Sequence, residues 1–288
     1  MKEELYMQQL QSKHDEFEKA REKFKQGVQA RNGDRYKKLQ NVDTAIETAV
    51  DLAYNDAKRT LAGIGKYSDK KDNALKCIIE KLKNYFHEKK APLTDEEFDK
   101  IHDELCQLWC KEFKSPENGK LGTYGKAQKI VNMSFKYLYC CEDAESYRDH
   151  FKYCHMPLDS FTLEWFKRKQ FKQNRPDKKI ASWSKLENSE NNADTFIDDG
   201  KEFYSYHFYK KKIREIANGK NLSPLEMEFI VWPQIQMELA AEGFLFGLEE
   251  DLTNEEKKEI KKMPLKDKYD KIVEFLNKRK VECEDATH

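Results

Sequence analysis

Apolar residues recur mostly at three- and four-residue spacing along this chain, which is the pattern of amphipathic helices. Only 11 glycines and 7 prolines interrupt this pattern, and little of the sequence alternates as a β-strand does. We therefore expect an all-α protein. The predicted helices cover residues 3–30, 41–62, 74–86, 94–115, 126–138, 142–153, 160–169, 201–217, 223–246 and 253–280, with a loop-like stretch at 173–200.

Two of these helices have clear start signals. Thr94 and Glu97 are spaced as a capping box, in which the Thr94 side chain accepts from the Glu97 amide and the Glu97 side chain reaches back. Ser223 is the expected N-cap of a helix that Pro224 opens. Residues 115–119 should end the helix that Thr94 begins, because they contain proline and an Asn-Gly turn.

We divide the chain into three regions. Residues 1–90 form an N-terminal helical region, and residues 91–185 contain a candidate hairpin described below. Residues 186–288 form a C-terminal acidic helical region that can pack against the first, and they end in a frayed tail.

The 288 residues are 38% hydrophobic, 12% aromatic and 37% charged. This content of apolar and aromatic side chains supports a buried core and argues against a disordered chain. No apolar run reaches the roughly 18–20 residues that a membrane span needs, and the N-terminus lacks the apolar segment of a signal peptide. Seven cysteines in such a chain indicate reduced thiols, so we expect a cytoplasmic protein with no membrane partner.

The formal net charge is zero, but the charges are unevenly distributed. Residues 111–185 hold 16 basic and 9 acidic side chains, whereas residues 186–288 hold 16 basic and 23 acidic ones. A basic middle beside an acidic end is compatible with a polyanionic partner such as DNA, although a solvated lysine-rich face gives the same count.

Candidate chemistry lies in this basic region. The segment 120–125 reads Lys-Leu-Gly-Thr-Tyr-Gly and leads into a lysine-bearing helix. A short hairpin between helices directs backbone N–H groups and a positive helix end outward, which suits a DNA phosphate. The expected DNA contacts are Lys120, Gly122, Thr123, Gly125 and Lys136.

The order of these residues resembles the helix-hairpin-helix DNA glycosylases over residues 94–166. In that family the hairpin reads Leu-Pro-Gly-hydrophobic-Gly, and an essential aspartate follows in a Pro-Val-Asp-Thr-like segment that opens the next helix. The matching stretches are Leu-Gly-Thr-Tyr-Gly at 121–125 and Pro-Leu-Asp-Ser at 157–160. The spacing of the glycines and the 34 residues between Gly125 and Asp159 differ from the family pattern.

The resemblance implies a bilobal helical fold, double-stranded DNA as partner, no cofactor, and removal of a modified or damaged base that is flipped out of the duplex. Asp159 would stabilise the positive charge that develops on the sugar, and Lys126 or Lys129 would form an imine that leads to strand cleavage. The alternatives are structural: Asp159 suits an N-cap, and both lysines suit a solvated helix face.

Two other groups of residues suggest different chemistry. Cysteine and histidine residues cluster in a way that permits metal binding, but their spacing is not that of a zinc finger, so small buried thiols and no metal are the preferred interpretation. The cluster comprises Cys140, Cys141, His150, Cys154 and His155. A run that is aromatic all round a helix lies either between two layers or on a contact surface for a protein partner. Its members are Phe203, Tyr204, Tyr206, Phe208 and Tyr209.

These patterns lead to two hypotheses from different classes. The first is a DNA-binding protein that acts as a DNA glycosylase, a hydrolase of DNA repair, with or without lyase activity. The second is a non-enzymatic helical protein that binds another protein, for example in a defence or regulatory system. The sequence alone leaves the substrate base, the oligomeric state and the pathway open.

Overall fold

The computed structural model describes residues 2–87, 91–115, 119–171, 176–188, 193–249, 252–261, 263–264, 267–268 and 270–275. The described residues are mostly helical, which confirms the predicted all-α class. They form two compact units, 1–232 and 233–288. Among the described helices, none combines the length and the apolar character that a membrane crossing requires.

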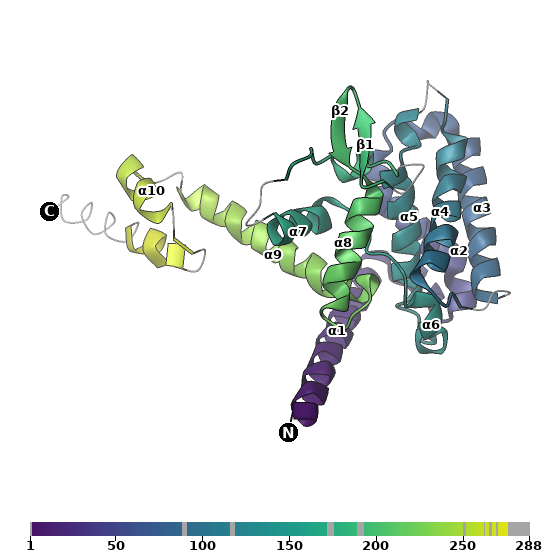
Figure 1. Ribbon diagram of the computed structural model, residues 1–288, viewed down its shortest axis with the longest axis horizontal. Helices are drawn as coiled ribbons and strands as arrows, with labels where there is room; N and C mark the ends of the chain where they lie inside the picture. Colours follow the sequence, from purple (N-terminus) through teal and green to yellow (C-terminus); the bar gives the residue numbers. More distant parts are fainter. Residues whose placement is uncertain are drawn as a thin grey trace. The chain divides into compact units, whose positions relative to one another are not determined.

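The elements follow one another along the chain as Figure 1 shows. The α-helices are α1 (Lys2–Asn32), α2 (Val42–Ala57), α3 (Ser68–His87), α4 (Asp95–Glu112), α5 (Tyr124–Leu138), α6 (Arg148–Phe151), α7 (Ser160–Gln170), α8 (Tyr206–Asn218), α9 (Pro224–Glu249) and α10 (Asn254–Ile260). Two strands, β1 (Thr195–Asp198) and β2 (Lys201–Tyr204), form an antiparallel hairpin. Short 3₁₀ turns occupy Gly33–Lys38, Lys58–Thr60, Ile64–Tyr67, Gly119–Leu121, Ala144–Tyr147 and Trp183–Lys185.

Helix α5 is the centre of the first unit. It packs against α2 and α4, and α3 packs against both of those helices (Figure 1). Every residue from Tyr124 to Leu138 is buried. The predicted apolar stripe of α5 is therefore correct, but it is only one side of a helix that has no solvated face.

The three lysines of α5 do not lie on a solvated face, so that alternative is wrong. Lys126 is 7% exposed, Lys129 is 6% exposed and Lys136 is 2% exposed. The positions of these lysines in the sequence place them away from the apolar stripe, but they do not show which parts of the chain cover them. Other parts of the chain cover them and provide polar partners.

One cluster of buried apolar side chains runs from Phe17 to Val231 and includes residues from all three regions distinguished in the sequence. Its largest members include Trp109, Tyr85 and Phe98, which are fully buried. Aromatic pairs contribute to this packing, as in the edge-to-face contact of Tyr85 with Phe135, whose ring centroids lie 5.7 Å apart. In the second unit, Leu252, Ile260 and Ile272 form a separate small cluster.

The predicted helix starts are confirmed. The Thr94 side chain accepts from the Glu97 amide at 3.2 Å, and the Glu97 carboxylate reaches back to the Leu93 amide at 2.8 Å instead of that of Thr94. Ser223 and Glu226 form the same reciprocal arrangement, with bonds of 2.8 and 3.1 Å. These bonds satisfy N–H groups that have no partner inside the helix.

The β-hairpin corrects the predicted helix at 201–217. Residues 201–204 are a strand, and the helix begins at Tyr206 after the Ser205 cap. Asp199 and Gly200 connect the strands with φ values of 48° and 68°. A two-residue turn with positive φ at both positions matches the twist of a hairpin, and Asp-Gly is a sequence that adopts it.

Other helix boundaries also differ from the predictions. Helix α2 ends at Ala57, before the predicted residue 62, and α3 begins at Ser68, ahead of the predicted residue 74. Pro233 lies inside α9, as it does in the predicted helix 223–246, and α9 continues to Glu249. In the predicted helix 253–280, α10 covers Asn254–Ile260. The predicted turn at 118 and the tail at 282–288 lie outside the described residues.

Gly125 is required by close packing. A Cβ atom at this position would overlap the carbonyl oxygen of Trp183, whereas a Cβ atom at Gly65 would meet nothing within 4 Å. Alanine favours a helix over glycine by about 1 kcal/mol, but overpacking of a core costs about 1–3 kcal/mol or more.

We therefore expect Gly125→Ala to lower the free energy of unfolding by about 2 kcal/mol or more, because the clash outweighs the gain in helix propensity. Gly65→Ala, the matched control, should change it by less than about 0.5 kcal/mol. Urea denaturation of both variants measures the difference. Equal stabilities would show that the contact between Gly125 and residue 183 is not tight in solution.

Candidate functional site

Two ion pairs connect α5 to later parts of the chain. Lys129 Nζ lies 2.8 Å from the Oδ2 atom of Asp159, the residue that precedes α7. Lys136 pairs with Glu228 on α9. All four side chains are nearly inaccessible to solvent, with Asp159 the most exposed at 12%. A buried charge is stable only with a partner, so each lysine depends on its carboxylate.

Asp159 is both an N-cap and the partner of a lysine. Its Oδ1 atom accepts from the backbone amides of Phe161 and Thr162 at 2.9 and 3.0 Å, which confirms the capping interpretation. Its Oδ2 atom accepts from Lys129 Nζ and from the indole N–H of Trp232, the latter at 3.1 Å. The cap thus fixes the carboxylate and leaves one oxygen facing α5.

The charged state of this pair is stabilised by its own contacts. Burial alone would raise the pKa of Asp159, but the charge and hydrogen bond of Lys129 outweigh burial and lower it. Burial alone would lower the pKa of Lys129, but Asp159 outweighs that effect and raises it. In the resting protein Lys129 is therefore an ammonium ion and Asp159 a carboxylate.

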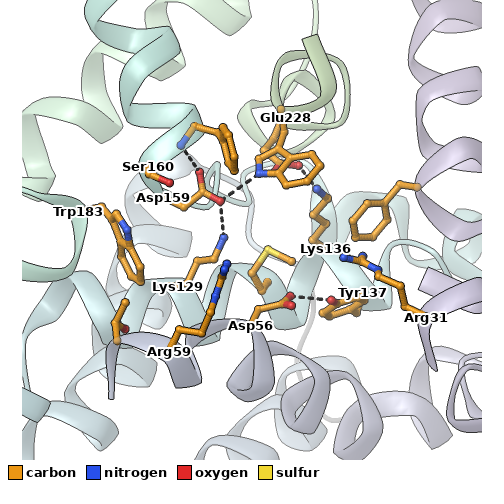
Figure 2. A pocket seen from close by; sticks show the side chains of 15 residues that line it. Arg31, Asp56, Arg59, Lys129, Lys136, Tyr137, Asp159, Ser160, Trp183 and Glu228 are labelled. Carbon is orange, nitrogen blue, oxygen red and sulfur yellow. Dashed lines mark hydrogen bonds and ion pairs between the residues drawn. The ribbon is translucent and has the colours of Figure 1, made fainter. Parts of the chain in front are cut away.

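Both ion pairs face one cavity of about 410 Å³ (Figure 2). The cavity combines aromatic rings with charged groups from α1, α2, α5, α7, α9 and the 3₁₀ turns at Lys58–Thr60 and Trp183–Lys185. Its lining consists of Phe24, Arg31, Asp56, Arg59, Thr60, Lys129, Met133, Lys136, Tyr137, Asp159, Ser160, Phe161, Trp183, Glu228 and Trp232. Flat apolar walls with a few fixed charges are typical of a small-molecule or nucleobase pocket.

Arg59 is an exposed cation in this lining. In Figure 2 its side chain lies beside that of Lys129. Within the described part of the chain, Arg59 makes no hydrogen bond or ion pair. The Asp56 carboxylate nearby is already bonded to the Tyr137 hydroxyl at 2.6 Å. The Arg59 guanidinium is therefore available to an anion at this cavity.

The predicted hairpin is covered by the chain itself. The Thr123 hydroxyl donates to the carbonyl of Ser184 at 2.7 Å, and the Gly125 amide donates to the carbonyl of Leu186 at 2.8 Å. Residues 183–187 therefore occupy the groups that were expected to meet a DNA phosphate. The hairpin borders a different cavity from the one that holds Lys129 and Asp159.

The other expected phosphate contacts also lie in different surroundings. Gly122 packs so closely on Phe113 that a Cβ atom would lie 2.9 Å from the Phe113 Cβ. Lys120 is exposed, and its carbonyl accepts from the Lys126 ammonium. Lys136 is buried in its ion pair with Glu228. Of the five residues expected to contact DNA, Lys120 is exposed, Gly122 and Thr123 are half-buried, and Gly125 and Lys136 are buried.

A protein carboxylate occupies the start of α5, where a phosphate was expected. Glu187 Oε2 accepts from the Tyr124 amide at 3.4 Å. Burial raises the pKa of Glu187 to about 7, and burial lowers the pKa of nearby Lys126. The structure thus separates the two candidate nucleophiles: Lys129 meets Asp159, and Lys126 lies on the hairpin side with Glu187.

The aromatic run at 203–209 lies inside the protein and not on a contact surface. Four of its five members are buried, and Phe203 is half-buried. Tyr204 stacks on Phe208 with ring centroids 4.1 Å apart, and Phe208 contacts Phe166 of α7 edge to face. The predicted surface for a protein partner is therefore absent at these side chains.

The cysteine and histidine cluster consists of buried side chains, except for His150, which is half-buried. Burial raises the pKa of Cys140 to about 12, and the Cys154 thiol donates to the His150 carbonyl at 3.5 Å. Among the described residues, no three histidine, cysteine, aspartate or glutamate side chains are placed to hold a metal ion.

A second cavity, of about 770 Å³, contains a polar network around α5. The His155 Nε2 atom lies 2.7 Å from Asp99 Oδ1, and its Nδ1 atom lies 3.0 Å from the Tyr206 hydroxyl. Asn132 of α5 donates to that hydroxyl at 3.1 Å and contacts His102. Burial lowers the pKa of His155 to about 4, so the ring is neutral near pH 7. This network satisfies the amide of Asn132 in the core.

Comparison with models of known protein families, with curated proteins and with solved structures finds no match to this chain. The function must therefore be inferred from the geometry of the site.

Sequence reasoning missed Glu228, Trp232 and Arg59. Glu228 directly precedes the apolar run Phe-Ile-Val-Trp at 229–232. A carboxylate beside such a run is a signal of a buried ion pair. Trp232 follows Glu228 by one helical turn, so both side chains lie on one face of α9. Arg59 had no distinguishing signal, because it follows α2 among other polar residues.

Because Glu187 is half-buried against the start of α5, the stability of the protein should depend on pH. The pKa of the Glu187 carboxyl group is about 7 in the folded protein, against an ordinary value of 4.5. Between pH 4.5 and about pH 7, the folded state therefore binds more protons at this group than the unfolded state does. Stability is therefore lost as the pH rises through this window. At about 1.4 kcal/mol for each pKa unit, and allowing for partial exposure, the loss is about 2 kcal/mol.

We compare the free energy of unfolding of Glu187→Gln with that of the wild-type protein at pH 4.5 and at pH 8. Between these pH values, the difference should shift by about 2 kcal/mol in favour of the variant. Urea denaturation at both pH values measures this change, and titration of other groups cancels in the comparison. A difference that does not vary with pH would show that Glu187 titrates normally.

Proposed function

We propose that this protein is a DNA glycosylase with lyase activity, and that Lys129 and Asp159 carry its chemistry. The observation that carries the proposal is the 2.8 Å contact of a buried lysine with a buried aspartate at the edge of an aromatic cavity. The proposal includes double-stranded DNA as substrate, a glycosylase-like arrangement of the helices, and action in the cytoplasm.

The cavity suits a nucleotide flipped out of a duplex. Trp232 contacts Phe161 with ring centroids 5.4 Å apart, and Trp183 lines the same cavity. A flipped base stacks between aromatic side chains in enzymes that act on bases. Arg59, beside Lys129, is available to bind a phosphate that flanks the flipped nucleotide. DNA is thus proposed to bind through the cavity lining and not through residues 120–125.

The proposed reaction begins with proton transfer inside the Lys129 and Asp159 pair. Asp159 accepts a proton from the Lys129 ammonium, and the free amine attacks C1′ of the sugar as the bond to the base breaks. The electron pair of that bond leaves with the base, which takes up a proton. Loss of a proton from the attached nitrogen and opening of the sugar ring then give an imine, from which strand cleavage follows.

Lys126 is not the proposed nucleophile. Its ammonium donates to the carbonyl of Lys120, and it lines the cavity that contains Glu187 instead of Asp159. Among the residues that the structure describes, no carboxylate is bonded to the Lys126 ammonium. The two lysines lie on the same helix, three residues apart, and therefore form a matched pair for testing the proposal.

An imine between protein and DNA can be trapped by reduction. Wild-type protein incubated with a duplex containing one abasic site and sodium borohydride should form a covalent complex visible on a denaturing gel. Lys129→Arg should form none, because a guanidinium keeps the charge beside Asp159 but forms no imine. Lys126→Arg should trap as the wild type does.

Thermal melting of both variants establishes that they are folded. Trapping by folded Lys129→Arg, or loss of trapping in Lys126→Arg alone, would contradict the assignment of Lys129. Absence of trapping in the wild-type protein would contradict the lyase reaction itself.

A further inference from the structure

The second ion pair of the cavity has no part in the reaction at the sugar. Lys136 follows Lys129 by two helical turns, about 10 Å along the axis of α5. It therefore lies at the other end of the same cavity. If the sugar of a flipped nucleotide lay at Lys129, its base could extend along the cavity toward Lys136.

Lys136 is surrounded by aromatic faces as well as by a carboxylate. Its Nζ atom lies 3.9 Å from the ring centroid of Phe24, 4.9 Å from that of Phe229 and 5.7 Å from that of Trp232. Glu228, its partner, is 1% exposed. Such a pair contributes little to stability, because the loss of hydration of two buried charges opposes their attraction. Its position on the cavity wall suggests a role toward a ligand.

Trp232 connects the two ends of the cavity. Its indole N–H donates to Asp159, and its ring also faces Lys136. A base that stacks on the aromatic lining would therefore have the Lys129 and Asp159 pair at one edge and the Lys136 and Glu228 pair at the other.

We propose that Lys136 and Glu228 bind the polar edge of the flipped base and that Lys136 supplies the proton that the base takes up as it leaves. This inference rests on the proposed glycosylase function. The ligand is a nucleobase that carries a hydrogen-bond donor beside an acceptor, because an ammonium group donates and a carboxylate accepts. The ring nitrogens of such a base are the proton acceptors.

The proton balance of the reaction closes with this assignment. The bond from C1′ to the base breaks, and its electron pair goes to the base. One proton moves from the Lys136 ammonium to a ring nitrogen, which leaves a neutral amine beside the Glu228 carboxylate. The negative charge gained at this end balances the positive charge on the nitrogen that becomes attached to C1′.

Abasic DNA separates this role from that of Lys129, because it has the sugar but no base. The test measures two reactions: release of free base from duplexes carrying uracil, hypoxanthine or 8-oxoguanine, and borohydride trapping on an abasic duplex. In the double variant Lys136→Met/Glu228→Gln, both charges are removed together, so neither is left buried alone. Base release should fall by about 10²-fold or more, the usual contribution of an acid catalyst, while trapping should stay close to the wild type.

Two further variants make the result specific. Lys136→Arg keeps the ion pair and the aromatic contacts but does not give up a proton, so its base release should fall while its melting temperature is retained. Ser134→Ala removes a buried hydroxyl of α5 that donates to the Ile130 carbonyl at 2.8 Å, and it should change neither reaction.

Several results would overturn the inference. Unchanged base release in both Lys136 variants would exclude the pair from the reaction. Parallel loss of base release and trapping would indicate a structural role. If the wild-type protein were trapped on abasic DNA but released none of the three bases, the assignment of Lys136 and Glu228 to base binding would be wrong. Absence of both reactions in the wild type would instead contradict the glycosylase proposal on which the inference rests.

Discussion

The pairing of charges on a completely buried helix is the constraint on which this structure depends. Helix α5 has no solvated face, yet it carries lysine, glutamine and asparagine side chains. Unpaired buried charges and amides are costly, so other parts of the chain must supply their partners. Asp159 and Glu228 do so for Lys129 and Lys136, and Tyr206 does so for Asn132. These contacts hold α7, α8 and the part of α9 that belongs to the first unit against α5.

The same constraint creates the candidate site. Beside α5 the two ion pairs and the aromatic rings around them line a cavity. Its wall therefore contains charged groups whose positions are fixed by their partners. The capping bonds of Asp159 hold its carboxylate in one orientation toward Lys129. The hairpin at 120–125 has a different role, because its polar groups bond to residues 183–187 and anchor the start of α5.

Local sequence signals predicted much of the fold. Three- and four-residue spacing indicated most helices, and the caps at Thr94, Asp159 and Ser223 formed where residue type and spacing placed them. The turn at Asp199 and Gly200 was missed, although an Asp-Gly pair between short aromatic stretches is a hairpin signal.

The cavity was less predictable, because its residues come together only in the folded chain. Lys129 and Asp159 were singled out as candidates, but their contact depends on how α7 packs on α5, which no spacing rule shows. Lys126 and Lys129 were indistinguishable in the sequence and have different partners in the structure. Trp232 and Glu228 lie about 70 residues or more beyond Asp159 and so escaped a search based on one local motif.

The most direct test of the central claim is to locate the covalent bond. Wild-type protein reduced with borohydride on abasic DNA, then digested with nuclease and protease, can be mapped by mass spectrometry. The Lys129 and Asp159 geometry predicts the sugar remnant on Lys129. A remnant on Lys126, on another amine or on no residue would contradict the assignment of this cavity as the active site.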